Sequence, residues 1–542
     1  MKKFLSTLLV LAMVLSMAAC GGGAGTSTPS STPAAGSSGG SASSAVEGES
    51  DRSEKMKISV ALWDAETVDD KVGQFVQDKL NVEFDLQPLS WDNPEQVSLF
   101  GATDSLPDVT GSYPTNEMSM FYSWIEQGII RDIPYEMIEK YPYIKEIVDN
   151  DVVLNAVKEV QGGKYWYLPR PESFENIYQA TTTGIYYRKD WLENVGIEKA
   201  PETVDEFYEM LVAFKEKDPD GNGKNDTVPL SMQKFVSDTT PDLLFGFWGL
   251  ADPMSWYKTD DGTWQPGYFT DAMLEPLKFY RKLYQEGLID PEFTTVSRDQ
   301  MIQLLCTGKA GCIVRNADAD WVNKVVNRNF QTANPDLDAL ETIGLLSPLS
   351  AKEGEEPTVA PFPSLSGSYI SSEVDDAKLE RILDWMNWTL SPEGRDLYRY
   401  GIEGESYKRD GDKIELIMDP ATGEAYRYES IQLGLIATWD YDFAADPDAV
   451  NDFMPGIKEM AAEYRLKMNE CVQYNDDGLI AKMISTPAKD ELQIAVGDKF
   501  MQIIIGTEDV ETMFRAFQDE CRNLGMDDAI QEVTAEMAKR SK

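Results

Sequence analysis

The chain has 542 residues, of which 93 are acidic, 49 are basic and none is histidine, so its formal net charge is −44. This charge argues against nucleic acid as a partner and against docking on an anionic membrane surface. Without histidine, Ser-His-Asp and Cys-His catalytic groups and imidazole zinc sites are excluded. With 42% hydrophobic and 11% aromatic residues, the chain can bury a large core and still place aromatic rings on a binding surface.

The first 19 residues predict a signal peptide that ends at a lipid-attachment site. Two lysines at positions 2 and 3 precede an apolar run over 4–19, which is too short to span a bilayer. Residues 17–20, Met-Ala-Ala-Cys, are similar to a bacterial lipobox. The similarity implies cleavage before Cys20 and a diacylglycerol on its sulfur. The alternative is an ordinary signal peptide that happens to be followed by a cysteine.

Residues 20–54 are rich in Gly, Ser, Thr, Ala and Pro. Such a segment cannot bury enough apolar surface to fold, and it predicts a disordered tether with a reach of roughly 30 Å. No other segment has 18 consecutive apolar residues. We therefore expect a globular body on the extracellular face of the cell membrane, held there only by the lipid.

Hydrophobic spacing predicts that the body begins with a strand over 57–62, a helix over 68–80 and a strand over 82–86. This βαβ unit implies parallel strands, and a helix over 94–103 and a strand over 106–109 follow it. Open parallel sheets bind ligands beyond the carboxyl ends of their strands. The side chains expected at those ends are Trp63 and Asp64 after the first strand and Gly111, Ser112 and Tyr113 after the third.

Further elements alternate along the rest of the chain. A turn and short strand are expected over 162–170, and a strand over 184–188. Thr203 and Glu206 form a capping box that opens a helix. Helices are then expected over 271–286 and 298–307, a strand over 308–315, and helices over 375–400 and from 447 to the end. The pattern indicates an α/β fold.

Several short segments together resemble the family-1 extracellular solute-binding proteins, and within them a long lipoprotein branch with a calcium loop. They are Leu106-Pro107-Asp108-Val109, Tyr187-Arg188-Lys189-Asp190-Trp191-Leu192, 203–229, 286–290, 308–311 and 401–404. The resemblance implies a two-lobed, type II periplasmic-binding-protein-like fold with a multi-strand hinge. It also implies a monomer that closes over a solute and delivers it to an ABC permease. The expected lobes are 55–180 plus 366–424 and 181–365 plus 425–542.

The segment 218–226 matches the first nine positions of an EF-hand loop, in which alternate residues point toward one Ca²⁺ ion. Gly223 stands at the sixth position, but the twelfth is Pro229 rather than a bidentate glutamate. Thr227 stands where related lipoproteins often carry an acid. The alternative to a structural calcium site is a metal-free turn. The expected ligands are Asp218, Asp220, Asn222, the Lys224 carbonyl and Asp226.

Aromatic rings can stack on sugars, and carboxylates and arginines can bind their hydroxyls, so an oligosaccharide is the expected ligand. Core packing is the competing interpretation for each ring. The expected contacts are Trp63, Asp64 and Tyr113 from one lobe, Arg315 with Asn316 and Asp318 from the other, and Trp166 and Arg170 beside the first crossover. Possible further platforms in the second lobe are Trp248, Trp256 and Trp439.

Two questions stay open at the level of sequence. Four cysteines follow Cys20, and their spacing does not distinguish disulfides from free thiols; they are Cys306, Cys312, Cys471 and Cys521. Function also has alternatives to the ABC-importer receptor. One is a receptor of similar fold that carries a peptide or passes its ligand to a sensor, and the other is a surface glycoside hydrolase with paired carboxylates.

Overall fold

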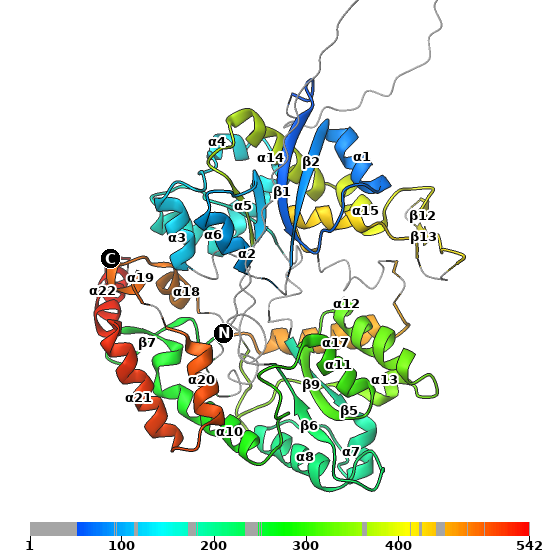
Figure 1. The fold of residues 1–542 in the computed structure, drawn as a ribbon, viewed down its shortest axis with the longest axis vertical. Coiled ribbons are helices and arrows are strands. Elements are labelled where there is room, and N and C mark those ends of the chain that lie inside the picture. The colour runs from blue at the N-terminus through cyan, green and yellow to red at the C-terminus, as the bar shows by residue number, and fades with distance from the viewer. Residues whose placement is uncertain are drawn as a thin grey trace, which may run out of the picture. The chain divides into compact units, whose positions relative to one another are not determined.

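The first strand and the helix that follows it have the predicted βαβ order. In the computed structural model, β1 (Met56–Trp63) and β2 (Val82–Leu89) pair in parallel, joined by α1 (Lys71–Leu80) (Figure 1). The Asp70 carboxylate accepts a hydrogen bond from the Gly73 amide and begins the helix, and Asn81 ends it in the left-handed conformation. Most of β1 is buried on both faces, as expected of a central parallel strand.

The structure describes residues 51–90, 93, 95–112, 118–171, 180, 183–233, 248, 250, 252–359, 366–411, 413–421, 425–440, 450–451, 453–473, 475–492 and 494–540. The predicted signal peptide, Cys20 and nearly all of the tether lie outside these residues. So does Tyr113.

The first sheet has five strands in the order β2-β1-β3-β11-β4. β3 (Val109–Ser112) is parallel to β1, whereas β11 (Gly367–Ile370) is antiparallel to both β3 and β4 (Leu168–Pro169). The sequence predicted that this third strand would end at Val109, but pairing begins there and continues through Gly111 and Ser112. Pro107 lacks the backbone donor that a ladder needs, which delays the start of the strand.

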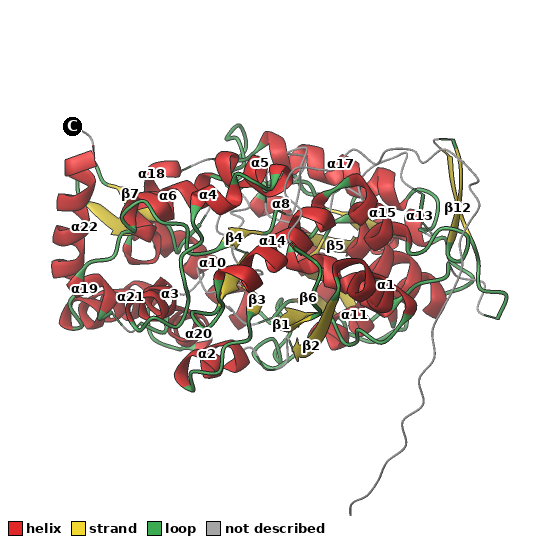
Figure 2. Cartoon of the chain, turned by 90° about the horizontal axis from the view of Figure 1, so that it is seen from above, coloured by secondary structure: helices red, strands yellow, loops and turns green. Residues whose placement is uncertain are grey.

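Helices cover this sheet (Figure 2). They are α1, α2 (Glu95–Ala102), α3 (Met118–Glu126), α4 (Tyr135–Ile138), α5 (Pro142–Asn150), α6 (Val152–Val160), α14 (Asp376–Leu390), α15 (Pro392–Tyr400) and a 3-10 helix over Glu429–Ile436. A separate hairpin, β12 (Tyr407–Asp410) with β13 (Lys413–Leu416), follows α15.

The second sheet has four strands in the order β10-β5-β9-β6. They are β5 (Thr183–Arg188), β6 (Val228–Ser231), β9 (Ala310–Asn316) and β10 (Ile343–Leu345). Only β6 and β9 pair in parallel. The helices of its core are α7 (Lys189–Val195), α8 (Val204–Glu216), α10 (Leu274–Gln285), α11 (Arg298–Cys306), α12 (Ala319–Val322), a π-helix over Asn323–Gln331, α13 (Ala339–Thr342), α17 (Ile457–Glu470), α20 (Val496–Ile505) and α21 (Val510–Asn523).

The predicted capping box at the start of α8 is confirmed. The Glu206 amide donates to the Thr203 hydroxyl, and the Thr203 amide donates to the Glu206 carboxylate, each at 3.2 Å. The two bonds satisfy amides that have no partner within the helix. The helix then buries one face, including Phe207, Leu211 and Phe214, against the second sheet.

Two large hydrophobic cores, one per sheet, lie within the unit Glu47–Lys542. The α/β fold with two cores agrees with the expected architecture. Two stretches after residue 424 pack in the first core, through Leu433, Ile436 and Ala437 and through Met483, whereas the sequence predicted that everything after 424 belongs to the second lobe. Residues 172–179, 181–182, 360–365 and 441–449 lie outside the described part of the chain. The expected multi-strand hinge stays a prediction.

The C-terminal region adds a small third cluster, in which Trp256 and Trp264 pack on Val533 and Met537. Its elements are β7 (Trp256–Lys258), β8 (Trp264–Pro266), α18 (Asp476–Met483), α19 (Pro487–Asp490) and α22 (Met526–Arg540), with short 3-10 helices over Gly267–Phe269 and Asp271–Met273 before α10. The Tyr122 hydroxyl donates to the Met483 carbonyl and ties α18 to α3. The sequence had predicted only that helices dominate here.

The four described cysteines are free thiols, which answers the question that their spacing left open. Cys306, Cys312 and Cys521 are buried and Cys471 is partly buried. Within the described residues, no helix is both long enough and apolar enough to cross a membrane.

The second core should respond to truncation as close-packed cores do. Leu211 on α8 is fully buried, whereas Leu466 on α17 is 63% exposed. We expect Leu211→Ala to lower the free energy of unfolding by roughly 2–5 kcal/mol, because it removes buried methyl groups and leaves a cavity. Leu466→Ala, the matched control, should change it by less than about 0.5 kcal/mol. Urea unfolding followed by circular dichroism measures both; equal losses would contradict the assignment of Leu211 to a core.

Candidate ligand-binding site

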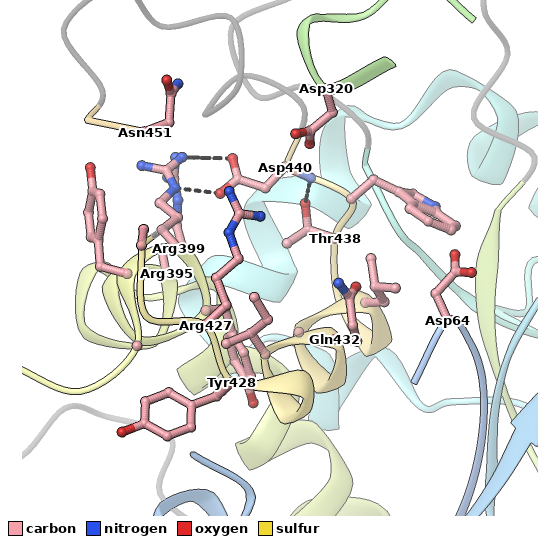
Figure 3. Close-up of a pocket in the computed structure, with 18 of the residues that line it drawn as sticks. Asp64, Asp320, Arg395, Arg399, Arg427, Tyr428, Gln432, Thr438, Asp440 and Asn451 are labelled. Atoms are coloured by element: carbon pink, nitrogen blue, oxygen red, sulfur yellow. Dashed lines mark hydrogen bonds and ion pairs between the residues drawn. The ribbon is translucent and has the colours of Figure 1, made fainter. Parts of the chain in front are cut away.

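A cavity of about 330 Å³ is lined by segments from both cores. The first sheet contributes Asp64, directly after β1, and its core contributes α15 and the segment 425–440. The second core contributes Asp318, Asp320 and Trp321 at the start of α12. Figure 3 shows the charged side chains from these segments around one space. A concave site with a few convergent polar groups is the usual form of a small-molecule site.

Asp64 is the residue at which the chain leaves β1. Its φ is 60°, in the left-handed region, which aspartate tolerates better than most non-glycine residues. The side chain is exposed and lines the cavity. The carboxyl end of this parallel strand presents a polar side chain to the cavity, and a role of Asp64 in ligand binding stays a prediction.

Asp318 brings a buried carboxylate to the opposite side of the cavity. Its Oδ1 accepts a hydrogen bond of 3.0 Å from the Trp321 amide and caps α12, while Oδ2 accepts none within the described residues. Burial, and next the charge of Asp320, raise the pKa of Asp318 from 3.8 to about 6. Oδ2 is thus a buried acceptor on a residue that lines the cavity, and a ligand hydroxyl could donate to it.

Trp321 supplies a half-buried aromatic ring to the same side. The Arg315 guanidinium lies 3.7 Å from its ring centre and the Lys324 ammonium lies 4.3 Å from it. Arg315 is 3% exposed and donates to Asn316 Oδ1, and burial lowers its pKa to about 10. Arg315 therefore supports the indole.

The other end of the cavity holds three arginines. Arg399 forms a two-pronged ion pair with Asp440, at 2.6 Å from Nε to Oδ2 and 2.7 Å from Nη2 to Oδ1. Arg395 Nη2 lies 3.8 Å from the same Oδ1, and Arg427 lines the same cavity. The Asp440 amide donates to the Thr438 hydroxyl at 3.0 Å, which fixes the loop that carries the carboxylate (Figure 3).

The structure places some of the predicted contact residues at the cavity and others away from it. Asp64, Asp318 and Trp439 line it. Trp63 is 3% exposed, packs in the first core and donates its indole N–H to the Ser112 hydroxyl. Because β1 is buried on both faces, its last residue turns into the core instead of toward the cavity.

Arg170 is fully buried and acts one layer behind the cavity. It donates to the Leu435 carbonyl at 2.7 Å, and its guanidinium lies 5.1 Å from the centre of the Trp439 ring. Arg315 stands in the same relation to Trp321. Both predicted arginines thus contact an aromatic ring that lines the cavity and are not among its described lining residues themselves.

Three further tryptophans lie in other surroundings. Trp166 packs on the first core, and the Lys164 ammonium lies over its ring. The centre of the Trp248 ring lies 5.3 Å from the centre of the Phe279 ring. Trp256 belongs to the third cluster. None of the three is among the cavity's described lining residues. The predicted contact Tyr113 lies outside the described part of the chain.

Sequence reasoning missed Trp321 and the arginines of α15. Trp321 lies only six residues after Arg315 and five after the end of β9, so the same strand-end argument could have reached it. Arg395 and Arg399 lie four apart on one helix face, a spacing that is also common on solvated surfaces. Arg399 lies 41 residues before Asp440 in the sequence, and Arg395 lies farther from it, so no local pattern indicates that they meet.

The predicted calcium loop is a tight turn with three left-handed residues, Asp218, Gly221 and Gly223. The Asn222 side-chain amide donates to both Asp220 and Asp226, at 2.6 and 3.0 Å, and Lys309 pairs with Asp226 at 3.1 Å. The hydrogen bond from Asn222, and then that from Lys309, lower the pKa of Asp226.

The residues of this loop fit a cation in part. Asp218 Oδ1 is buried and accepts no hydrogen bond within the described residues, while Oδ2 accepts from the Gly223 amide. The Asn222 amide donates to two of the expected carboxylate ligands, Asp220 and Asp226. Among described residues, no three His, Cys, Asp or Glu side chains already form a metal-binding group. Binding would need Asn222 to turn its oxygen inward.

With two α/β cores and a polar, partly aromatic cavity between strand ends, the molecule has the form of a solute-binding protein. Residues 62–396, more than half of the chain, match the family model of the bacterial extracellular solute-binding proteins. The chain belongs to this family, which confirms the resemblance found in the sequence.

Three relatives illustrate the family. Lipoprotein LipO of Bacillus subtilis (strain 168) is 29% identical over 49% of this chain and 57% of LipO, less than two thirds of that relative. The polygalacturonan/rhamnogalacturonan-binding protein YtcQ of the same strain is 27% identical over 68% of this chain and 70% of YtcQ. The fructooligosaccharide ABC transporter substrate-binding protein FusA of Streptococcus pneumoniae serotype 4 (strain TIGR4) is 29% identical over 40% of this chain and 41% of FusA. The structure of FusA with kestose superposes with a TM-score of 0.61, at 17% identity over 90% and 99% of the two chains.

The raised pKa of Asp318 predicts a pH dependence of stability. Folded protein holds this proton more tightly than unfolded chain does, so the contribution of Asp318 to the free energy of unfolding is highest below pH 3.8. It falls as the pH rises to about 6. Between these two pH values, the contribution of Asp318 to the free energy of unfolding falls by an amount on the order of 3 kcal/mol.

Asp318→Asn keeps the helix cap and removes the titration. Urea unfolding from pH 4 to 7 should show that the variant gains stability relative to wild type as the pH rises. Parallel curves for the two proteins would mean that Asp318 is not held in a dry site.

Proposed function

We propose that this protein is a lipid-anchored receptor of an ABC importer, which captures an oligosaccharide outside the cell and delivers it to a permease. The observation that carries the proposal is the cavity itself, which is lined from both cores. A ligand that contacts Asp64 on one side and Asp318 or Trp321 on the other favours one arrangement of the two cores. Ligand binding can therefore shift a conformational equilibrium that a permease could recognise.

The chemistry of the cavity supports a sugar ligand. Sugars offer hydroxyls to carboxylates such as Asp318 and flat C–H faces to rings such as Trp321. Lys324, which is partly exposed on a flexible stem, can move off the indole, whereas the buried Arg315 stays in place. The named ligands of YtcQ and FusA support the same class.

We propose that Cys20 carries the lipid and that residues 20–54 form the tether. The lipobox-like sequence and the name of LipO, a lipoprotein, support this anchoring. We further propose that the protein acts as a monomer, since a binding cavity of this kind needs one chain only.

Two other functions remain testable. A receptor that carries a peptide, or that signals to a sensor, would use the same two-core geometry. A glycoside hydrolase would need paired carboxylates on opposite sides of a sugar bond, and Asp64 and Asp318 lie on opposite sides of this cavity, so the two functions are separated by whether a bound sugar is cleaved. We propose binding without turnover.

The loop 218–226 is proposed as a structural calcium site. Asp218, Asp220, Asn222 and Asp226 would supply side-chain oxygens, with the Lys224 carbonyl as a fifth ligand. The buried Asp218 oxygen supports the proposal, because burying such a group has a cost that a cation would offset.

Trp321→Ala should weaken the binding of an oligosaccharide identified by thermal-shift screening. The expected loss is roughly 1.5–3 kcal/mol, the value of burying a large side chain. Phe75→Ala, which removes a 39% exposed ring on α1 outside the cavity lining, is the matched control and should bind like wild type. Titration calorimetry measures both.

Unchanged affinity in Trp321→Ala would exclude the ring as a platform. Prolonged incubation should return the bound oligosaccharide intact. Cleavage that depends on the protein would favour the hydrolase instead.

Calcium should raise the melting temperature of wild type after treatment with a chelator, because an ion that binds only the folded state stabilises it. Asp220→Ala should remove this response. Asp260→Ala, which changes an exposed aspartate on the β7–β8 hairpin, should retain it. If wild type melts at the same temperature with chelator and with calcium, the loop is a metal-free turn.

A further inference from the structure

We propose that two tyrosines at one end of the cavity, Tyr426 and Tyr428, form a platform on which further units of a bound oligosaccharide stack, so that the protein favours chains longer than its cavity. We call these two residues the tyrosine platform. The inference rests on the proposed sugar-binding function and adds the length of the ligand to it. None of the contacts predicted from the sequence belongs to the platform.

The size of the cavity limits what it can enclose. Its volume of about 330 Å³ is near the lower end of the range for small-molecule sites, roughly 300–1,000 Å³. An oligosaccharide that places one unit on Trp321 and continues toward α15 therefore has further units outside the enclosed space. Those units need a surface that is open to solvent and still offers flat apolar contacts.

Tyr426 supplies such a surface. It lines the cavity and is 46% exposed. Of the large apolar side chains that are exposed within the described part of the chain, it is the one that also lines the cavity. An exposed apolar ring that continues a binding cavity indicates a ligand contact, whereas one that is scattered on the surface does not. A tyrosine ring is rigid, so it offers contact area at a low cost in side-chain entropy.

Tyr428 provides the second ring. It is half-buried and lines the same cavity, and its ring centre lies 6.3 Å from that of Tyr426, with 48° between the ring planes. Rings inclined in this way do not lie face to face, so a sugar unit can approach the face of Tyr426 while the unit before it meets Tyr428. Figure 3 shows Tyr428 beside Arg427 and away from Asp64 and Asp320.

Hydrogen bonds hold both rings of the platform in place. The Tyr426 amide donates to the Ile417 carbonyl at 3.0 Å. The Tyr428 hydroxyl donates to Glu405 Oε2 at 2.9 Å, and Lys71 of α1 pairs with the same oxygen at 2.6 Å. Burial, and then the bond to Glu405, raise the pKa of Tyr428 to about 12, so the hydroxyl keeps its proton and the bond. Rings that are ordered before binding lose less energy when a ligand arrives.

The hairpin β12–β13 carries this segment beyond α15 (Figures 1 and 2). Arg409 on β12 pairs with Asp396 on α15 at 2.6 Å. β13 ends at Leu416, which lines the cavity, and an antiparallel bridge between Met418 and Ala425 brings the chain back to it. A two-stranded hairpin is marginally stable alone, so its contacts with the first core make it a fixed extension of the site.

The test compares sugars that differ only in length. Malto-, cello-, fructo- and galacturono-oligosaccharides, each from the disaccharide to the hexasaccharide, would be titrated into the full mature protein by calorimetry. In a series that binds, we expect the affinity to rise with length until the platform is filled and then to stay constant. The expected gain is roughly three- to tenfold, the scale of one aromatic contact.

Tyr426→Ala should remove this gain and bind the shortest sugar within about twofold of wild type. Tyr426→Phe keeps the ring and should keep the gain. Phe75→Ala, which removes an exposed ring on α1 outside the cavity lining, is the matched control and should keep the gain as well. Melting temperatures of the three variants report whether any change alters the fold.

Each other outcome has a defined meaning. If the affinity of wild type does not depend on the length of the sugar, the inference is overturned and the sugar-binding function stands. The same holds if Tyr426→Ala keeps the whole gain, or if it weakens the shortest and the longest sugar equally. If this variant keeps the gain but no longer supports uptake by cells, the rings contact the permease and the inference is also overturned. If no sugar in the panel binds, both the inference and the proposed sugar-binding function are contradicted.

Discussion

The direction in which β1 and β9 run determines where this protein can bind a solute. β1 ends at Trp63 and delivers Asp64 to the cavity, and β9 ends at Asn316 and delivers Asp318 and α12 to the same cavity. Each strand is buried along most of its length, so polar side chains become accessible only where the strand stops. Each core packs around its own sheet, and residues that follow one strand of each sheet line the same cavity.

Behind the residues that line the cavity lies a layer of buried cations. Arg315 contacts the Trp321 ring, and Arg170 contacts both the Trp439 ring and the Leu435 carbonyl. These arginines fix the orientation of the aromatic side chains in front of them. The site is thus prepared before a ligand arrives, and less binding energy is lost in ordering it.

The sequence predicted much of the framework, because local patterns encode it. Alternation identified β1 and β2, the Thr203–Glu206 pair identified the start of α8, and the segments shared with the family identified the two-core fold. Trp63 was predicted as a ligand contact, since alternation does not indicate that both faces of β1 are covered. The segment 429–437 was assigned to the wrong core, because its apolar residues fit either one. The ion pair between Arg399 and Asp440 joins residues far apart in the sequence, and such long-range pairs leave no local signal.

The central claim is that one ligand contacts both cores within this cavity. A crystal structure of the mature protein with a bound oligosaccharide tests it most directly. The account predicts electron density for the sugar between Asp64 and Asp318, with a ring on Trp321 and one substituent directed to α15. Density at any other place, or contacts with only one of the two cores, would contradict it.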